Sequence, residues 1–158
     1  LLETEPLALP TEVSAWDPSF TRIDDRWYVA FVESPSQDPF IFHPALAAGL
    51  PGEPYDADLE LVGVDDSMSE GEGPIIQELG GVWHVLASNK NAGAYPIYDL
   101  TMRQLGTLDA PYVTNIPHPQ VINLLGGGHL MVTFDGTQYA EDVLGYGGHG
   151  DVVVMAAQ

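Results

Sequence analysis

Two carboxylates and an imidazole, all close to prolines, are the residues of this chain whose types and spacing could support chemistry. Asp17 and His118 each stand directly before a proline, and Glu72 stands two residues before one. Asp17 and Glu72 are 55 residues apart. Two carboxyl groups can perform acid–base catalysis when one donates a proton and the other, ionised, activates water or attacks. A neutral imidazole can bind a metal ion or water. These three residues are therefore candidate site residues.

The same three residues lie at the start of a repeated segment. Residues 16–31, 72–87 and 117–132 align without a gap. Each copy has a proline, a short apolar stretch, a Gly or Asp turn and a second apolar stretch, which predicts a β-hairpin. A period of roughly 45 to 56 residues is typical of β-propeller blades. The sequence therefore predicts that Asp17, Glu72 and His118 cluster at the same point of successive blades.

The rest of the sequence favours an all-β chain. Seventeen Gly and thirteen Pro are spread over 158 residues, and almost no window has the 3.6-residue period of an amphipathic helix. We predict a single β-propeller domain over 1–158, with about three blades near 10–65, 66–112 and 113–158. Strands are expected near 4–9, 18–23, 26–33, 39–43, 58–64, 74–79, 82–88, 95–99, 103–109, 119–125, 129–134 and 151–156. Residues 44–51 could form a short helical turn between two prolines.

Three blades are fewer than the four or more with which propellers close. The chain is therefore expected to be completed by further blades of a longer polypeptide or by a second copy. Bare apolar faces on the first and last sheets would make the isolated chain unstable or oligomeric.

The composition argues against two classes of partner. The chain has 23 Asp and Glu against four Lys and Arg, a formal net charge of −19, which repels phosphate backbones and anionic membranes. It has no run of about 18 apolar residues and no basic start of a signal peptide. Without cysteine there is no disulfide framework. Localisation stays open between secreted and cytoplasmic, and the acidity fits either general solubility or a saline habitat.

Two motifs resemble those of a known enzyme family. Residues 16–20 and 24–29, Trp-Asp-Pro-Ser-Phe and Asp-Asp-Arg-Trp-Tyr-Val, are similar to a signature of the five-bladed propeller glycoside hydrolases of family 43. That family comprises arabinanases and xylosidases and has invertase-like relatives. Residues 72–88, which begin Glu-Gly-Pro, resemble the segment that carries the general acid in this family. The resemblance implies a partial five-bladed propeller that acts on carbohydrate.

The resemblance also implies roles for individual residues. Glu72 would be the general acid that protonates the leaving oxygen of a glycosidic bond, and Asp17 would orient it and bind sugar hydroxyls. Without the resemblance, Glu72 could be a solvated loop carboxylate and Asp17 an Asx-Pro turn. Trp16, beside Asp17, could stack on a sugar. Trp27 and Trp83 coincide in the repeat and are interpreted as packing between blades.

Two histidines are further candidates for substrate binding. His118 is similar to a family histidine that faces an axial ion or water, although it could equally cap a turn. His149 lies in a glycine-rich stretch that could approach the same pit. No cofactor is expected to be required and no metal ligand is assigned, but an axial calcium ion stays open. The second carboxylate of the family, the base or nucleophile, is expected about two blades before Glu72.

Three hypotheses about function follow. The first is a glycoside hydrolase that cleaves O-glycosidic bonds of oligo- or polysaccharides by paired-carboxylate catalysis. The second is a carbohydrate-binding or catalytically inactive propeller. The third is a structural repeat protein with an acidic surface. A second catalytic carboxylate would distinguish the first from the second, and sugar binding would distinguish both from the third.

Overall fold

A computed structural model describes residues 5–89, 94–108, 119–135 and 151–156 of the chain. Within these ranges all regular secondary structure is β-strand, which confirms the predicted all-β class. No helix in this part of the chain is long and apolar enough to cross a membrane. His118 and His149 lie outside the described residues.

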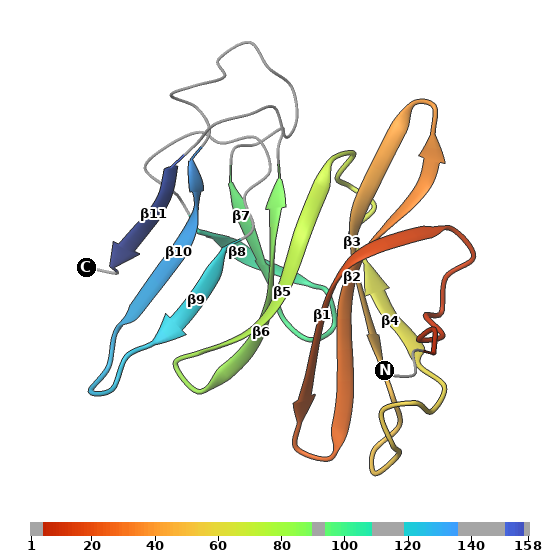
Figure 1. The fold of residues 1–158 in the computed structure, drawn as a ribbon, viewed down its shortest axis with the longest axis horizontal. Coiled ribbons are helices and arrows are strands. Elements are labelled where there is room, and N and C mark those ends of the chain that lie inside the picture. Colours follow the sequence, from red (N-terminus) through yellow and green to blue (C-terminus); the bar gives the residue numbers. More distant parts are fainter. Residues whose placement is uncertain (1–4, 90–93, 109–118, 136–150, 157–158) are drawn as a thin grey trace.

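The described strands form three antiparallel sheets (Figure 1). The first sheet has the order β1-β2-β3-β4 and the second β5-β6-β7-β8, so each strand pairs with the next one in sequence; the third has the order β11-β10-β9. The strands of the first sheet are β1 (Ser14–Ile23), β2 (Arg26–Gln37), β3 (Phe40–Ala48) and β4 (Glu60–Val64). Those of the second are β5 (Gly71–Leu79), β6 (Val82–Asn89), β7 (Tyr95–Tyr98) and β8 (Gln104–Leu108). Those of the third are β9 (Gln120–Asn123), β10 (His129–Asp135) and β11 (Asp151–Ala156).

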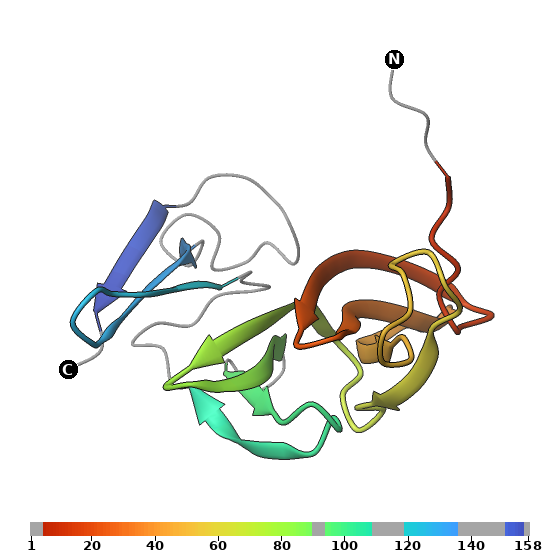
Figure 2. The ribbon, with the colours of Figure 1, turned by 90° about the horizontal axis from the view of Figure 1, so that it is seen from below.

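The sheets follow one another side by side, with the second between the first and the third (Figure 2). Strand β5, the first strand of the second sheet, contacts both β1 and β9. The first strands of all three sheets therefore lie together along one side of the arrangement.

The hairpins of the repeat close with different turns. Two residues connect β1 to β2 and two connect β5 to β6. Gly80 and Gly81 have φ values of 59° and 83°, the left-handed conformation that suits a two-residue hairpin turn. The third hairpin closes over residues 124–128 and pairs His129 with Asn123. Because this loop is longer, the third copy is shifted by one residue in its pairing, and the gap-free alignment describes the first two copies better.

Two predicted elements are wrong. Residues 44–51 do not form a helical turn, because Pro44 to Ala48 belong to β3 and pair with β2 on one side while Ala45 to Ala48 pair with β4 on the other. Small buried alanines on both faces allow this stretch to lie in the middle of a sheet. In the described part of the predicted strand 4–9, residues 5–9 are not in a strand.

The largest core lies between the first and second sheets. It joins Ala30 and Leu46 of the first sheet to residues of the second sheet and the connections; these are Met68, Ile76, Val85, Ala87, Tyr98 and Met102. The β5 backbone lies close to the first sheet at Gly71, where a Cβ would lie 2.9 Å from Cδ of the Pro44 side chain. Trp83 packs against this core, as predicted, whereas Trp27 stacks on Phe20 at 4.9 Å within the first sheet.

A hydrogen bond from a buried tyrosine stabilises the connection between these two sheets. The Tyr98 hydroxyl donates to Oδ2 of Asp65 at 2.7 Å, and Asp65 lies between β4 and β5. Burial, followed by the bond to Asp65 and its charge, raises the pKa of Tyr98 far above its usual value. The phenol therefore stays protonated, as a hydrogen-bond donor must.

The outer faces of the first and third sheets differ. Val29 and Phe31, on the face of the first sheet opposite the shared core, are fully buried with Leu9 and Leu59 packed over them. The prediction of a bare face is therefore wrong for the first sheet, because the chain covers it with its own segments. On the third sheet, Val152 is 75% and Val154 62% exposed, so an apolar face does lie open there.

Candidate active site

The two candidate carboxylates lie at matching irregularities of the first strands. The pairing of β1 with β2 is interrupted between Trp16 and Ser19, where Asp17 has a φ of 51°. The pairing of β5 with β6 is interrupted between Glu72 and Ile75, where Gly73 has a φ of 59°. The repeat is thus reproduced in the backbone, with Trp16 matching Glu72 and Asp17 matching Gly73. Bulges of this kind redirect side chains and are common beside active sites.

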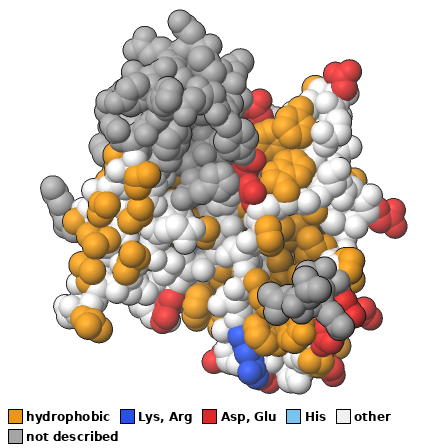
Figure 3. All heavy atoms as spheres, in the orientation of Figure 1, with side chains coloured by type: hydrophobic (Ala, Val, Ile, Leu, Met, Phe, Trp, Pro, Cys, Tyr) orange, Lys and Arg blue, Asp and Glu red, His pale blue; other side chains and the backbone are white. Residues whose placement is uncertain are grey.

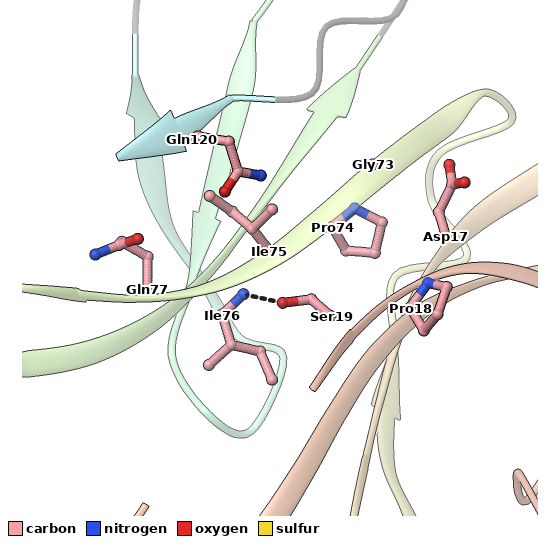
Figure 4. Close-up of a pocket in the computed structure, with 9 residues that line it drawn as sticks. All are labelled: Asp17, Pro18, Ser19, Gly73, Pro74, Ile75, Ile76, Gln77 and Gln120. Atoms are coloured by element: carbon pink, nitrogen blue, oxygen red, sulfur yellow. Dashed lines mark hydrogen bonds between the residues drawn. The ribbon is translucent and has the colours of Figure 1, made fainter. Parts of the chain in front are cut away.

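Asp17 reaches into a cavity between the sheets. The cavity has a volume of about 510 Å³ and is lined by Asp17, Pro18, Ser19, Gly73, Pro74, Ile75, Ile76, Gln77 and Gln120 (Figure 4). Its walls are therefore the bulged parts of β1 and β5, and β9 contributes Gln120. The Asp17 side chain is partly buried, and its Oδ2 is buried with no hydrogen-bond partner among the described residues. Buried carboxylate oxygens in folded proteins nearly always have a hydrogen-bond partner, so an unpartnered one at a cavity marks Asp17 as a candidate functional residue.

Strands β1 and β5 are held together at this cavity. The backbone N–H of Ile76 donates to Oγ of Ser19 at 3.0 Å (Figure 4). Ser19, Ile75 and Gln120 are equivalent in the repeat, each directly after the aligned proline, and all three line the cavity. The repeat alignment already placed these three residues at the same position. Ser19 and Gln120 were nevertheless not predicted as site residues, because neither is a typical catalytic residue type.

Glu72 lies beside the cavity, held by its neighbours. It is 5% exposed, and its Oε1 accepts a hydrogen bond of 3.2 Å from Nε1 of Trp16. Its backbone carbonyl accepts a bond of 2.7 Å from the buried Ser88 hydroxyl. Glu72 is therefore not a solvated loop carboxylate. Its side chain has a fixed orientation, which a proton donor requires.

Trp16 connects Glu72 to an aromatic cluster. Its ring lies 5.9 Å from that of Phe40, stacked at 25°, and 5.9 Å from that of Phe42, tilted at 54°. Hydrophobic side chains gather along the β2–β3 hairpin, next to acidic ones (Figure 3). Phe40 and Phe42 were not predicted as site residues; their only signal in the sequence is two aromatic residues alternating after an Asp-Pro dipeptide.

A second polar network was also missed. Nε2 of the buried His43 lies 3.1 Å from Oε1 of Glu33, whose Oε2 accepts a bond of 3.0 Å from Thr11. These residues tie the segment before β1 to the first sheet. No group of three or more His, Asp or Glu side chains that could hold a metal ion occurs among the described residues. The axial calcium ion therefore stays a prediction.

No protein-family model and no curated protein sequence matches the chain. Several solved structures match its fold. A GH43_1 enzyme from Xanthomonas citri, complexed with xylose, matches with a TM-score of 0.59 at 16% identity and covers 90% of this chain. A GH32 beta-fructofuranosidase from Bombyx mori matches with a TM-score of 0.59 at 18% identity over 98% of the chain. An endo-arabinase from Bacteroides thetaiotaomicron matches with a TM-score of 0.58 at 13% identity over 99%.

The chain folds as part of a β-propeller. The predicted resemblance in fold to five-bladed propeller glycoside hydrolases of family 43 and their invertase-like relatives is confirmed. The chain spans 47%, 38% and 60% of the length of these three neighbours. The cavity beside Asp17 is lined by β1, β5 and β9, which come first in sequence in the three sheets.

Proposed function

We propose that this propeller is the part of a glycoside hydrolase that carries the general acid, Glu72, and its supporting carboxylate, Asp17. The observation behind this proposal is the matched pair of bulges, which places a fixed Glu72 and a cavity-lining Asp17 on the first strands of two adjacent sheets. The neighbours of known structure support carbohydrate as the ligand, since GH43_1 from Xanthomonas citri was crystallised with xylose and with xylotriose.

In this mechanism Glu72 gives its proton to the leaving oxygen of the glycosidic bond. Oε1 accepts the Trp16 N–H, which orients the carboxyl group for this transfer. A second carboxylate, which activates water or attacks the anomeric carbon, is needed to complete the reaction. We propose that it comes from another blade of the complete protein. Asp17 would bind a sugar hydroxyl through its carboxylate and place a negative charge near the acid.

A carbohydrate-binding propeller without activity is the second candidate. It is favoured by the lining of the cavity, in which Asp17 is the only carboxylate among the described residues. The two candidates separate in one experiment on the full-length protein, which measures both the binding of xylotriose and the hydrolysis of aryl glycosides. Binding without hydrolysis would support the second candidate. If the protein neither binds xylotriose nor hydrolyses aryl glycosides, both candidate functions are contradicted.

Asp17→Asn tests the supporting role. The substitution removes a negative charge near Glu72 and retains the shape of the side chain, so Glu72 should lose its proton more easily. We expect the limb of the pH–activity profile in which activity falls as the acid deprotonates to move to lower pH. The kcat/KM profile of the full-length protein for an aryl glycoside measures this. If kcat/KM falls by the same factor at every pH and the profile does not shift, Asp17 only binds substrate and does not influence the acid.

The open face of the third blade predicts association. We propose that a further blade covers this face in the full-length protein and that a second copy covers it when the chain is isolated. Replacing Val152 and Val154 by Thr should weaken association of the isolated chain at least about tenfold, because two exposed valines contribute about 1 kcal/mol or more each when buried. Light scattering over a concentration series measures the effect. A soluble, cooperative monomer of the unchanged chain would contradict both proposals.

A further inference from the structure

Phe40 is an exposed aromatic residue that the fold alone does not require. It is the first residue of β3, and it is 50% exposed. Phe42, two residues later, is 4% exposed and already fills the apolar space beneath. The two rings lie 4.7 Å apart. One side of Phe40 is therefore supported by packed aromatic rings, while half of its surface faces solvent.

Trp16, which packs against Phe40, also contacts the candidate acid Glu72. Trp16 stacks on Phe40 with one part of its ring system and donates its Nε1–H to Oε1 of Glu72. A single side chain thus separates the exposed ring from the carboxyl group. Because Trp16 is held by Phe40, Phe42 and Glu72 together, the exposed ring has a defined position relative to Glu72.

We propose that Phe40, supported by Trp16 and Phe42, is a saccharide-binding subsite next to Glu72. The ligand would lay the apolar C–H face of one sugar ring on the exposed face of Phe40. Aromatic side chains suit this role because they offer a large rigid apolar surface at low entropic cost. The proposal rests on the proposed function, because it assigns a sugar unit to the surroundings of the same acid.

The charges near Phe40 restrict the ligand to neutral saccharides. Glu72 contacts Trp16, Asp38 lies two residues before Phe40, and Glu70 forms a backbone bridge with Phe42. The three described arginines are engaged elsewhere; Arg22 lies over Trp27, Arg26 over Tyr28, and Arg103 pairs with Asp99. A uronic acid unit on Phe40 would meet like charges, and no described arginine is placed to balance them. A neutral pentose or hexose unit avoids this cost.

The test is a titration of the full-length protein with xylotriose, in which binding is monitored through the NMR resonance of the Trp16 indole N–H. We expect Phe40→Ala to weaken binding about tenfold, the magnitude of one lost ring contact, and Phe40→Tyr to restore it. Phe20→Ala is the matched control, since Phe20 is 44% exposed and also stacks on a tryptophan, Trp27. This control should leave binding unchanged. A trimer of galacturonate should bind at least about tenfold more weakly than xylotriose, as expected for repulsion between like charges.

Three results would overturn the subsite. These are an equal loss in Phe40→Ala and Phe20→Ala, an unmoved Trp16 resonance at saturating xylotriose, and equal affinity for the galacturonate trimer. The proposed function fails separately. If Phe40→Ala weakens binding while Glu72→Gln leaves hydrolysis intact, the subsite stands and the role of Glu72 does not.

Discussion

Glu72→Gln in the full-length protein is expected to lower kcat for substrates with poor leaving groups by about 10²–10⁴-fold, the usual contribution of general acid catalysis. The amide cannot donate a proton as a carboxylic acid does, yet it has almost the same shape and can still accept the Trp16 N–H. The loss should be smaller for aryl glycosides with good leaving groups, because these depart with little protonation. Comparing kcat for a series of aryl glycosides of decreasing leaving-group pKa measures this dependence.

Glu78→Gln is the control for this substitution. Glu78 lies in the same strand, β5, and is only partly buried, but it does not line the cavity. Its substitution makes the same chemical change away from the proposed acid and should leave the kinetics unchanged. If Glu72→Gln resembles Glu78→Gln for every leaving group, Glu72 is not the acid, and a binding propeller becomes the better interpretation.

The repeat in the sequence predicted the parts of the fold that depend on local chemistry. Pro18 and Pro74 lie at the bulges of β1 and β5, and Gly80-Gly81 marks a tight hairpin, because these residues restrict or permit particular backbone angles. Residues 44–51 could not be predicted in the same way. A proline followed by alanines has weak strand propensity, and β3 forms there because strands on both sides pair with it.

The candidate site was predictable in its residues but not in its contacts. The spacing of Asp17 and Glu72 pointed to neighbouring blades, yet the bond from Trp16 to Glu72 crosses between sheets, and no local pattern encodes such a contact. The position of Phe40 above Trp16 also depends on how far the β2–β3 hairpin extends. In the third copy the sequence alignment does not predict the strand pairing. Its longer hairpin loop moves the partner of His129 by one residue relative to the partners of Tyr28 and His84.

The largest effect on stability is expected for Leu46→Ala. Leu46 is fully buried in the core that joins the first two blades, and removing its side chain leaves a cavity that rigid strands on both sides cannot fill. The free energy of unfolding should fall by about 2–5 kcal/mol. Urea denaturation followed by tryptophan fluorescence and by circular dichroism measures it.

Leu61→Ala is the matched control, because Leu61 lies in the neighbouring strand β4 and is 46% exposed. It should change the free energy of unfolding by no more than about 0.5 kcal/mol. Since the Leu46 core contains side chains from both sheets, the two blades should also unfold in one transition, with both probes coinciding. Separate transitions, or equal losses for the two leucines, would mean that the blades are stabilised independently. Asp17 and Glu72 lie on different blades, so their relative position depends on this shared core, and a loosened core should also weaken the binding of saccharide between them.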